Sequence, residues 1–307
     1  MKALVTGGAG FIGSHLTARL VRDGHAVTVV DDLSTGRREN LDGSAASLVV
    51  ANLSRDPLDA MLEGVEVIFH LAAVPSVPRS VAEPLRSHEA AATATLRLLD
   101  AAHRAGVGTF VNSSSSSVYG NVSEPPMREI MPTRPRSPYA VAKLAAEGYT
   151  RVFAELHGMR TVSLRYFNVF GPRQDPGSAY AAAIPRFISA YMRRERPTVY
   201  DDGRQSRDFT YVSNVVEANV LAAKAPRLAG ESVNVAAGEP RSILDLLWSI
   251  SDVFGYRLEP EFLPARPGDI RDSHADVSLA RELLNYQPVV EFADGLTETI
   301  RWLRGPA

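Results

Sequence analysis

Tyr139 and Lys143 form the residue pair whose types and spacing point most directly to proton chemistry. They lie four positions apart, behind Ser137 and Pro138, which are typical of a helix N-terminus, so we expect both on one helix face. The pKa of a phenol is about 10, and a phenol acts as a base near neutrality only if that pKa falls by roughly three units. Such a shift requires about 4 kcal/mol of stabilisation of the phenolate relative to the phenol. A neighbouring ammonium can lower that pKa. The pair therefore predicts a general base, although this spacing alone also arises by chance.

A run of five serines at 113–117 is the second candidate for chemistry. It follows an apolar run at 109–111 that we expect to form a strand, and parallel sheets bind ligands beyond the carboxyl ends of their strands. A hydroxyl there can hydrogen-bond a reacting hydroxyl group and relay a proton to Tyr139. Taken alone, the run is also consistent with a flexible serine turn.

Three glycines near the N-terminus predict a dinucleotide site. Gly7, Gly10 and Gly13 separate the first expected strand from the first expected helix. In that context they permit a tight turn, close approach of a diphosphate to the backbone, and close packing of the helix on the strand. The helix N-terminus then offers free N–H groups to the phosphates.

The end of the second expected strand indicates which dinucleotide is bound. Asp31 and Asp32 lie about twenty residues after the glycine turn, where a carboxylate can accept hydrogen bonds from ribose hydroxyls. A carboxylate also repels a 2′-phosphate, which favours NAD over NADP. Arg37 and Arg38 follow closely and can blunt that preference. The alternative is a plain turn that carries a solvated acid.

Short apolar runs alternate with longer helical patterns through the first half of the chain. The runs lack polar alternation, which is typical of parallel strands covered on both faces, so the pattern predicts a doubly wound α/β fold. The expected strands cover 3–5, 27–30, 48–50, 67–69 and 109–111, and the expected helices cover 11–21, 83–104 and 139–157. Both long helices are rich in alanine, so we expect them to form a dimer interface or, alternatively, to pack on the sheet.

The pattern changes after Asn168. Prolines and glycines interrupt the sequence up to about residue 203, which predicts a loop-rich region that faces a substrate. Helical patterns return at 215–223, 243–254 and 296–303. We therefore expect one large domain with a smaller C-terminal lobe.

Composition excludes several classes of function. The 307 residues contain no cysteine, which rules out disulfides and cysteine-based metal sites and suits a reducing compartment. The formal net charge of −2 creates no overall field for nucleic acid or an anionic membrane surface. The seven histidines show no spacing typical of metal ligands, and no apolar run reaches the ~18 residues of a membrane span.

At many segments the chain resembles the extended short-chain dehydrogenase/reductase superfamily, in its UDP-sugar 4-epimerase branch. The segments that carry the resemblance are TGGAGFIGSHL, VVDDLSTG, FHLAAVPSVPRS, SSSSSVYG, SPYAVAK, LRYFNVFGPRQDP, GRQSRDFTYV and RPGDIRDSHAD. They extend over nearly the whole chain and are most similar to the subgroup that acts on UDP-N-acetylglucosamine or UDP-N-acetylgalactosamine. The resemblance implies a Rossmann domain at 1–168 that binds NAD. It also implies a lobe at 169–307 that mainly binds a UDP-sugar, with some segments returning to the first domain.

The resemblance also implies the reaction, which is inversion of carbon 4 of a UDP-hexose through a transient 4-keto sugar. Tyr139 would take the proton of the sugar 4-hydroxyl, Lys143 would lower the pKa of Tyr139 and hold the nicotinamide ribose, and Ser115 would polarise the reacting hydroxyl. Bound NAD supplies the hydride chemistry. Related 4,6-dehydratases and UDP-glucuronate decarboxylases carry acidic residues near the positions of Ser116 and Ser117, so their absence here favours epimerisation over elimination.

By motif position the resemblance assigns residues to two binding sites. The cofactor site comprises Gly7, Gly10, Phe11, Ile12, Gly13, Asp31, Asp32, Asn52, Leu53, Leu71, Ala72, Ala73, Ser113, Tyr139, Lys143 and Tyr166. The UDP-sugar site comprises Pro75, Ser115, Asn168, Ala183, Ile184, Val199, Tyr200, Arg207, Arg266, Asp269 and Ser273. Arg207 and Arg266 are expected to clamp the diphosphate, because the guanidinium fork binds phosphate in a bidentate manner.

Ser273 stands where galactose-restricted relatives carry a bulky tyrosine. Serine leaves room for an N-acetyl group, so we expect activity on N-acetylated sugars, with non-acetylated ones tolerated. A uronic acid is an alternative substrate, because Arg79 or Arg173 can meet a carboxylate. The chain departs from the family pattern at Asn52, where an aspartate usually holds adenine, and at Ala91, where an asparagine usually lies near the nicotinamide.

Two other functions stay open as alternatives. One is a different reaction on the same scaffold, such as that of a nucleotide-sugar dehydratase or reductase. The other is a non-catalytic dinucleotide-binding regulator, but such proteins tend to lose the tyrosine or the lysine, and this chain keeps both. The resemblance further implies a cytoplasmic homodimer that uses neither nucleic acid, membrane nor metal.

Overall fold

A seven-stranded parallel sheet forms the larger layer of the computed structural model, which describes residues 1–121, 125–175, 183–265 and 271–305. The strand order is β11-β6-β5-β4-β1-β2-β3, and neighbouring strands pair in parallel. The strands are β1 (Lys2–Thr6), β2 (Ala26–Asp31), β3 (Ser47–Val50), β4 (Val67–His70), β5 (Thr109–Ser115), β6 (Arg160–Tyr166) and β11 (Glu231–Val235). The order reverses between β1 and β4, which is the switch point where doubly wound sheets bind ligands.

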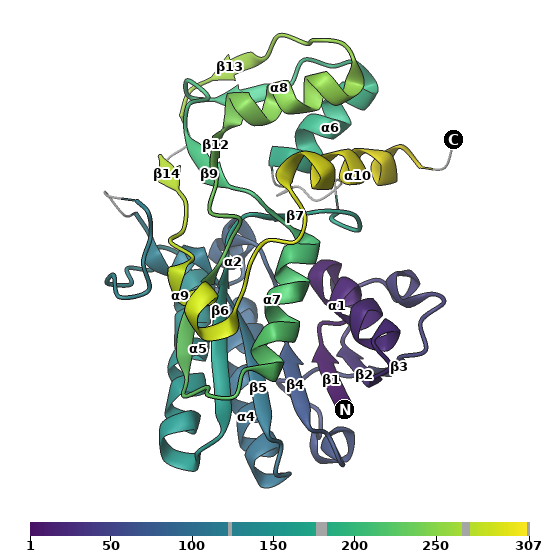
Figure 1. Ribbon diagram of the computed structural model, residues 1–307, viewed down its shortest axis with the longest axis vertical. Coiled ribbons are helices and arrows are strands. Elements are labelled where there is room, and N and C mark those ends of the chain that lie inside the picture. The colour runs from purple at the N-terminus through teal and green to yellow at the C-terminus, as the bar shows by residue number, and fades with distance from the viewer. Residues whose placement is uncertain (122–124, 176–182, 266–270, 306–307) are drawn as a thin grey trace.

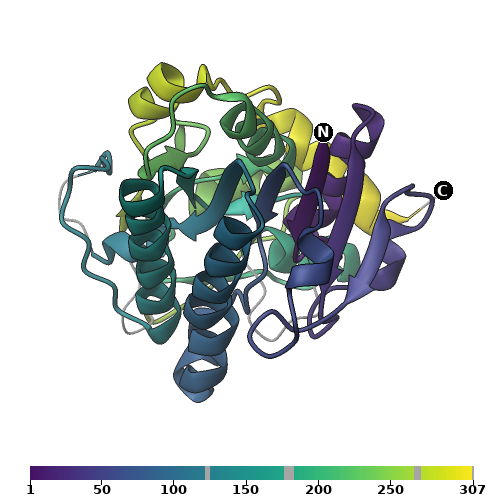
Figure 2. The same ribbon diagram turned by 90° about the horizontal axis from the view of Figure 1, so that it is seen from below.

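Helices cover both faces of this sheet, as the view from below in Figure 2 shows. The helices nearest to it are α1 (Phe11–Arg22), α4 (Ala94–Arg104), α5 (Pro138–His157) and α7 (Val212–Lys224). Leu4 and Phe110 enter one core with residues of α4, whereas Val5 and Phe69 enter another with residues of α1 and α7. The strands are apolar without alternation because both of their faces are covered. The predicted doubly wound α/β fold is confirmed.

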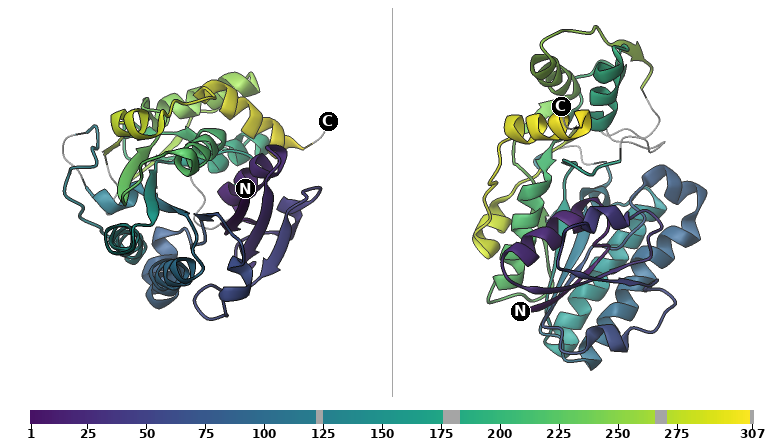
Figure 3. Two further views of the ribbon diagram at one scale, coloured as in Figure 1. Left: turned by 60° about the horizontal axis from the view of Figure 1, so that its bottom comes forward. Right: turned by 90° about the vertical axis from the view of Figure 1, so that its right-hand side faces the viewer.

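A second lobe lies above the carboxyl ends of the strands (Figures 1 and 3). Its elements are α6 (Ala183–Arg193), α8 (Ile243–Phe254), α10 (Phe292–Arg304) and the short strands β7 (Val169–Phe170), β8 (Thr198–Tyr200), β9 (Ser206–Asp208), β10 (Thr210–Tyr211), β12 (Pro240–Ser242), β13 (Glu261–Leu263) and β14 (Asp272–Ser273). It has its own core, in which Phe170, Tyr191 and Leu247 are buried. Strand β11 and helix α9 (Ser278–Leu284) belong to the lower layer, so the chain passes between the two layers repeatedly.

The helix expected over 83–104 is interrupted in the structure. It consists of α3 (Pro84–His88), a π-helical turn η3 (Glu89–Thr93) and α4, and it follows the short helix α2 (Val77–Ala82). The extra residue of a π turn rotates the helix face that follows it, and such turns are frequent at functional sites. Here the turn lies beside the cleft described below, which Ala90 and Ala94 line.

Candidate active site

A cleft of ≈ 750 Å³ opens at the switch point of the sheet. The glycine turn, the ends of β2, β4 and β5, and the first turns of α5 line it. All sixteen residues predicted for the cofactor site lie along this cleft, together with Pro75 from the predicted substrate site. The topology therefore brings these residues together, although they are spread over 160 positions of the chain.

Close packing within the protein requires glycine at two positions of the glycine turn, and the turn leads into an uncapped helix N-terminus. Gly7 has a φ of 67°, and a Cβ on it would lie 2.8 Å from the backbone nitrogen of Ala72. A Cβ on Gly13 would lie 2.1 Å from the carbonyl oxygen of Gly7, so any side chain there would push α1 away from the turn. Gly10 precedes α1 without a side-chain cap, which leaves the first N–H groups of the helix available to an anion.

Asp31 is held in position at the end of β2. Its Oδ2 accepts a hydrogen bond from the backbone N–H of Ala9 at 2.9 Å, and its Oδ1 accepts one from the N–H of Leu33 at 2.9 Å. Burial raises the pKa of this carboxyl group, and the two backbone hydrogen bonds oppose the shift. A carboxylate offers about four lone-pair sites, so about two of them stay available for the hydroxyls of a ribose.

Asn52 lies in the cleft but is already occupied. Its side-chain oxygen accepts from the N–H of Ser54 at 3.0 Å and from the Ser54 hydroxyl at 2.6 Å, and its amide donates to Asp32 at 3.2 Å. An amide oxygen has two lone pairs, so a hydrogen bond to the adenine amine requires one of these contacts to break. The assignment of Asn52 to adenine stays a prediction.

The residues predicted for proton chemistry meet at the first turns of α5. Ser137 caps the helix, because its hydroxyl accepts from the N–H of Ala140 at 3.2 Å. The Nζ of Lys143, which is buried, donates to the carbonyl oxygen of Ser113 at 2.7 Å and to its hydroxyl at 3.2 Å. Burial lowers the pKa of Lys143 to about 8, and the charge of Glu147 opposes this shift.

Tyr139 forms a side-chain hydrogen bond with Ser115. Burial raises the pKa of the phenol, and this hydrogen bond lowers it. Ser115 itself accepts from the N–H of Ser117 at 3.2 Å, which orients its hydroxyl. In the structure the hydrogen bonds of Lys143 go to Ser113, so the idea that Lys143 lowers the pKa of Tyr139 stays a prediction.

A buried ion pair lies behind this group and was not predicted. Glu147 is one helical turn beyond Lys143, and both of its oxygens accept from Arg165, at 2.9 and 2.7 Å. Its Oε1 also accepts from the hydroxyl of Ser114 at 2.5 Å, and its Oε2 from Ser232 at 3.0 Å. The pair therefore ties α5 to β5, β6 and β11, because each partner comes from one of these elements.

His70 is a second buried group that sequence reasoning missed. Its Nδ1 lies 2.7 Å from the hydroxyl of Thr6, and its Nε2 lies 2.9 Å from the hydroxyl of Thr95. Thr95 donates its own proton to the carbonyl oxygen of Ala91 at 2.6 Å, so Nε2 must carry the imidazole proton. Burial lowers the pKa of His70 to about 3, which keeps it neutral. The histidine links β4 to the first turn of α4, directly after the π turn, and a lone histidine carries no sequence signal for such a role.

The predicted substrate residues of the second lobe gather around β9. Ser273 pairs with Arg207 between β14 and β9, and it is buried. The Nη1 of Arg207 donates to the carbonyl oxygens of Ser206 at 2.7 Å and Arg271 at 3.2 Å. Asn168 donates to the carbonyl oxygen of Asp208 at 3.2 Å, at the other end of the same strand.

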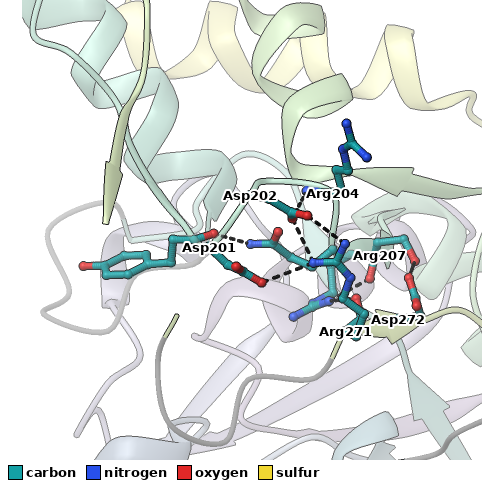
Figure 4. A network of polar contacts seen from close by, with 9 residues as sticks. Asp201, Asp202, Arg204, Arg207, Arg271 and Asp272 are labelled. Atoms are coloured by element: carbon teal, nitrogen blue, oxygen red, sulfur yellow. Dashed lines mark hydrogen bonds and ion pairs between the residues drawn. The ribbon is translucent and has the colours of Figure 1, made fainter. Parts of the chain in front are cut away.

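An ion-pair network surrounds Arg207, as Figure 4 shows. Arg271 forms a bidentate pair with Asp202, at 2.8 and 2.9 Å, and also contacts Asp201 at 3.2 Å. The hydrogen bond from Arg271 lowers the pKa of Asp202 to about 2. The ion pairs of Arg271 with Asp201 and Asp202 therefore hold the residue whose carbonyl oxygen accepts from Arg207.

The other predicted substrate residues are less accessible. Ile184 and Val199 are buried in the core of the second lobe, and Ala183 packs against that core, so their contact with uracil stays a prediction. Tyr200 is half-buried, and the guanidinium of Arg186 lies 5.9 Å from the centre of its ring. Arg266 and Asp269 lie outside the described residues.

The described part of the chain also bears on metal binding and on membrane insertion. In that part, no three His, Cys, Asp or Glu side chains come together as a metal site. None of its helices combines the length and the apolar character that crossing a membrane requires.

The chain is similar to known proteins over nearly its whole length. The model of the NAD dependent epimerase/dehydratase family matches residues 3–236. A curated relative, UDP-glucose 4-epimerase of Mycolicibacterium smegmatis, is 42% identical over 99% of both chains. The solved UDP-N-acetylglucosamine 4-epimerase of Methanobrevibacter ruminantium, in complex with UDP-N-acetylmuramic acid, is 42% identical to this chain, with a TM-score of 0.95. The match covers 99% of this chain and 98% of that one. UDP-glucose 4-epimerase of Thermotoga maritima, solved with UDP-glucose, is 38% identical with a TM-score of 0.92 and 99% coverage of both chains.

Proposed function

The chain belongs to the NAD dependent epimerase/dehydratase family, and we propose that it is an enzyme that inverts carbon 4 of a UDP-hexose. The observation that carries the proposal is the position of Tyr139. It lies in the same cleft as the glycine turn, forms a hydrogen bond with Ser115, and stands one helical turn before Lys143. A dinucleotide-binding fold that lacks the side chains of Tyr139, Ser115 and Lys143 can bind the dinucleotide but has no group to move a proton at a sugar hydroxyl.

The residues of the cleft fit NAD. The backbone around Gly7 and Gly13 leaves no room for side chains and offers the N-terminus of α1 to a diphosphate, and Asp31 keeps lone pairs free for ribose hydroxyls. Lys143, which lines the same cleft, would hold the nicotinamide ribose. When bound, NAD supplies a reversible hydride acceptor.

The residues of the chain itself supply the proton transfer. Tyr139 takes the proton of the sugar 4-hydroxyl and later returns it, and Ser115 holds the reacting oxygen and stabilises the phenolate. The ammonium of Lys143, fixed by Ser113, adds a positive charge on the same helix face. Inversion further requires that the 4-keto sugar turn over between the two proton transfers while UDP stays bound in the second lobe.

We propose that N-acetylated UDP-hexoses are accepted together with non-acetylated ones. Ser273 is small, and it lies directly beside Arg207, the residue proposed to bind the UDP diphosphate. A larger residue there would occupy space next to the sugar. UDP-N-acetylglucosamine, UDP-N-acetylgalactosamine, UDP-glucose and UDP-galactose are therefore the expected substrates.

The experiment that tests the function is incubation of the purified protein with these UDP-sugars and UDP-glucuronic acid, with the stereochemistry at carbon 4 read by NMR. We expect equilibration of the 4-epimers without net production of NADH, and we expect Tyr139→Phe to abolish it. Stoichiometric release of NADH, or a 4-keto product, would instead assign a dehydrogenase or a dehydratase. Unchanged turnover in Tyr139→Phe would remove the proposed base.

We also propose that the protein is a homodimer that pairs through α5. Val141, Tyr149, Val152 and Leu156 form an exposed apolar stripe along this helix. A monomer would leave the stripe in water, whereas a second copy would cover it through a symmetric contact. Leu156→Arg is expected to convert the dimer to a monomer in light scattering, and a wild-type monomer would contradict the proposal.

The remaining assignments also stand as proposals. We assign NAD binding mainly to residues 1–168 and UDP-sugar binding mainly to 169–307. A cysteine-free chain that uses NAD suits a reducing compartment, so a cytoplasmic location is proposed and can be tested by cell fractionation.

A further inference from the structure

Arg173 is a half-buried cation that has no counter-ion in the described part of the chain. Its Nη1 is buried and makes no hydrogen bond there, and no described carboxylate acts on its pKa, which burial lowers. A buried guanidinium without an anion is costly, because it loses hydration without gaining a partner. The surrounding structure holds it in place nevertheless, with a φ of 67° that non-glycine residues rarely adopt.

The loop that carries Arg173 is fastened to the helix of the glycine turn. The Nε2 of His15 on α1 lies 2.9 Å from the carbonyl oxygen of Pro172. Gln174 donates from its amide nitrogen to the carbonyl oxygen of Val169 at 3.1 Å, which leaves its buried side-chain oxygen without a partner among the described residues. Asp175 in turn lies 3.7 Å from Arg37. The His15 contact holds the loop against α1, and the Asp175 contact ties it to the segment after β2. Arg173 and Gln174 line the same cleft as Gly7 and Gly10.

We propose that Arg173 reaches from the second lobe to bind the diphosphate of the dinucleotide opposite the glycine turn. The inference rests on the proposed NAD-dependent function and adds a residue to its cofactor site. The N-terminus of α1 contacts the diphosphate from one side with backbone N–H groups, and the guanidinium supplies a full positive charge from the other. The missing partner of Arg173 is then the ligand itself.

The diphosphate of a UDP-sugar is the other possible source of the same chemistry. The lining of the cleft favours the dinucleotide, because it includes Arg173 but not Asn168, Arg207 or Ser273, which were assigned to the UDP-sugar. Those residues surround β9 instead. Arg173 and Arg207 are thus assigned to two different diphosphates.

The test measures dissociation constants of the NAD-free protein for NAD, ADP, adenosine and UDP by calorimetry. We expect Arg173→Gln to weaken NAD and ADP by about 10- to 100-fold, the range of a charged hydrogen bond, and to leave adenosine and UDP unchanged. Arg173→Lys should recover only part of the loss, because it keeps the charge but not the guanidinium fork. Arg160→Gln is the matched control, since Arg160 is also half-buried, has a nitrogen without a partner among the described residues, and lies outside the cleft.

Thermal melting without ligand separates a binding role from a structural one. Removing an unpaired buried charge should leave the melting temperature of the ligand-free protein unchanged or higher, whereas the rise produced by NAD should shrink. Equal NAD affinity in wild type and Arg173→Gln, a weakening of UDP instead of NAD, or a lower melting temperature of the ligand-free variant would each overturn the inference. Failure of the wild-type protein to bind NAD would instead contradict the proposed function.

Discussion

Removal of the Ser115 hydroxyl should move the pH dependence of the reaction. In the structure burial raises the pKa of Tyr139, and the hydrogen bond with Ser115 lowers it. A hydrogen bond to a charged group contributes about 1.5–3 kcal/mol, which corresponds to roughly one to two pKa units. Ser115→Ala should therefore raise the pKa of the phenol by that amount.

The sign of the effect follows from the form of Tyr139 that reacts. The phenolate is the base, so activity rises as the pH passes upward through the pKa of Tyr139. With that pKa raised, the rise in kcat/KM should shift by about one to two units to higher pH, and activity near neutrality should fall by about 10- to 100-fold. Activity should recover as the pH increases.

The assay is kcat/KM for UDP-sugar turnover between pH 6 and 10, roughly the range around the unperturbed phenol, because this ratio reports the free enzyme in which the hydrogen bond is present. Ser117→Ala is the matched control, since its hydroxyl is buried and unpartnered among the described residues, and its N–H to Ser115 is retained. A loss in Ser115→Ala that is equal at every pH would refute the reasoning. It would show that the hydroxyl acts on the substrate alone.

Three other changes test separate parts of the structure. Glu147→Gln breaks a buried pair whose side chains are 5% exposed, so urea unfolding should show that the free energy of unfolding falls by about 3–5 kcal/mol. The control Glu155→Gln, at an exposed pair, should lower it by about 0.5 kcal/mol, and similar losses in the two variants would contradict this view of the Glu147–Arg165 pair. Gly13→Ala should abolish NAD binding in calorimetry, because its Cβ would lie 2.1 Å from a backbone oxygen of the turn. Ser273→Tyr should reduce turnover of UDP-N-acetylglucosamine by about tenfold or more while UDP-glucose turnover changes by less than about threefold, and an equal effect on both sugars would remove Ser273 as the selective residue.

The parts of the site that sequence predicted are those whose geometry is local. The spacing of Gly7, Gly10 and Gly13 follows from the needs of one turn, and Tyr139 and Lys143 share a face because they lie one helical turn apart. The alternation of apolar runs and helices was likewise sufficient to predict the doubly wound sheet.

The parts that sequence did not predict depend on contacts between distant segments. Glu147 and Arg165 become partners only when α5 packs beside β6, and His70 gains its role only when it meets Thr95 at the start of α4. The position of Arg173 is set by the docking of its loop on α1, whereas the sequence alone suggested only a substrate carboxylate as its ligand. The local sequence pattern does not predict these contacts, because their partners lie far apart in the sequence.

Strand β11 joins the later part of the chain to the central sheet, so the two parts of the chain are expected to hold together even when the connection between them is cut. It comes from the later part of the chain but pairs with β6 from Val162 to Tyr166. A fragment ending at residue 168 would expose the bare edge of that strand, with unsatisfied peptide groups ready to recruit other chains. Limited proteolysis between the lobes should therefore yield a nicked but intact particle, and the two pieces should separate only on denaturation.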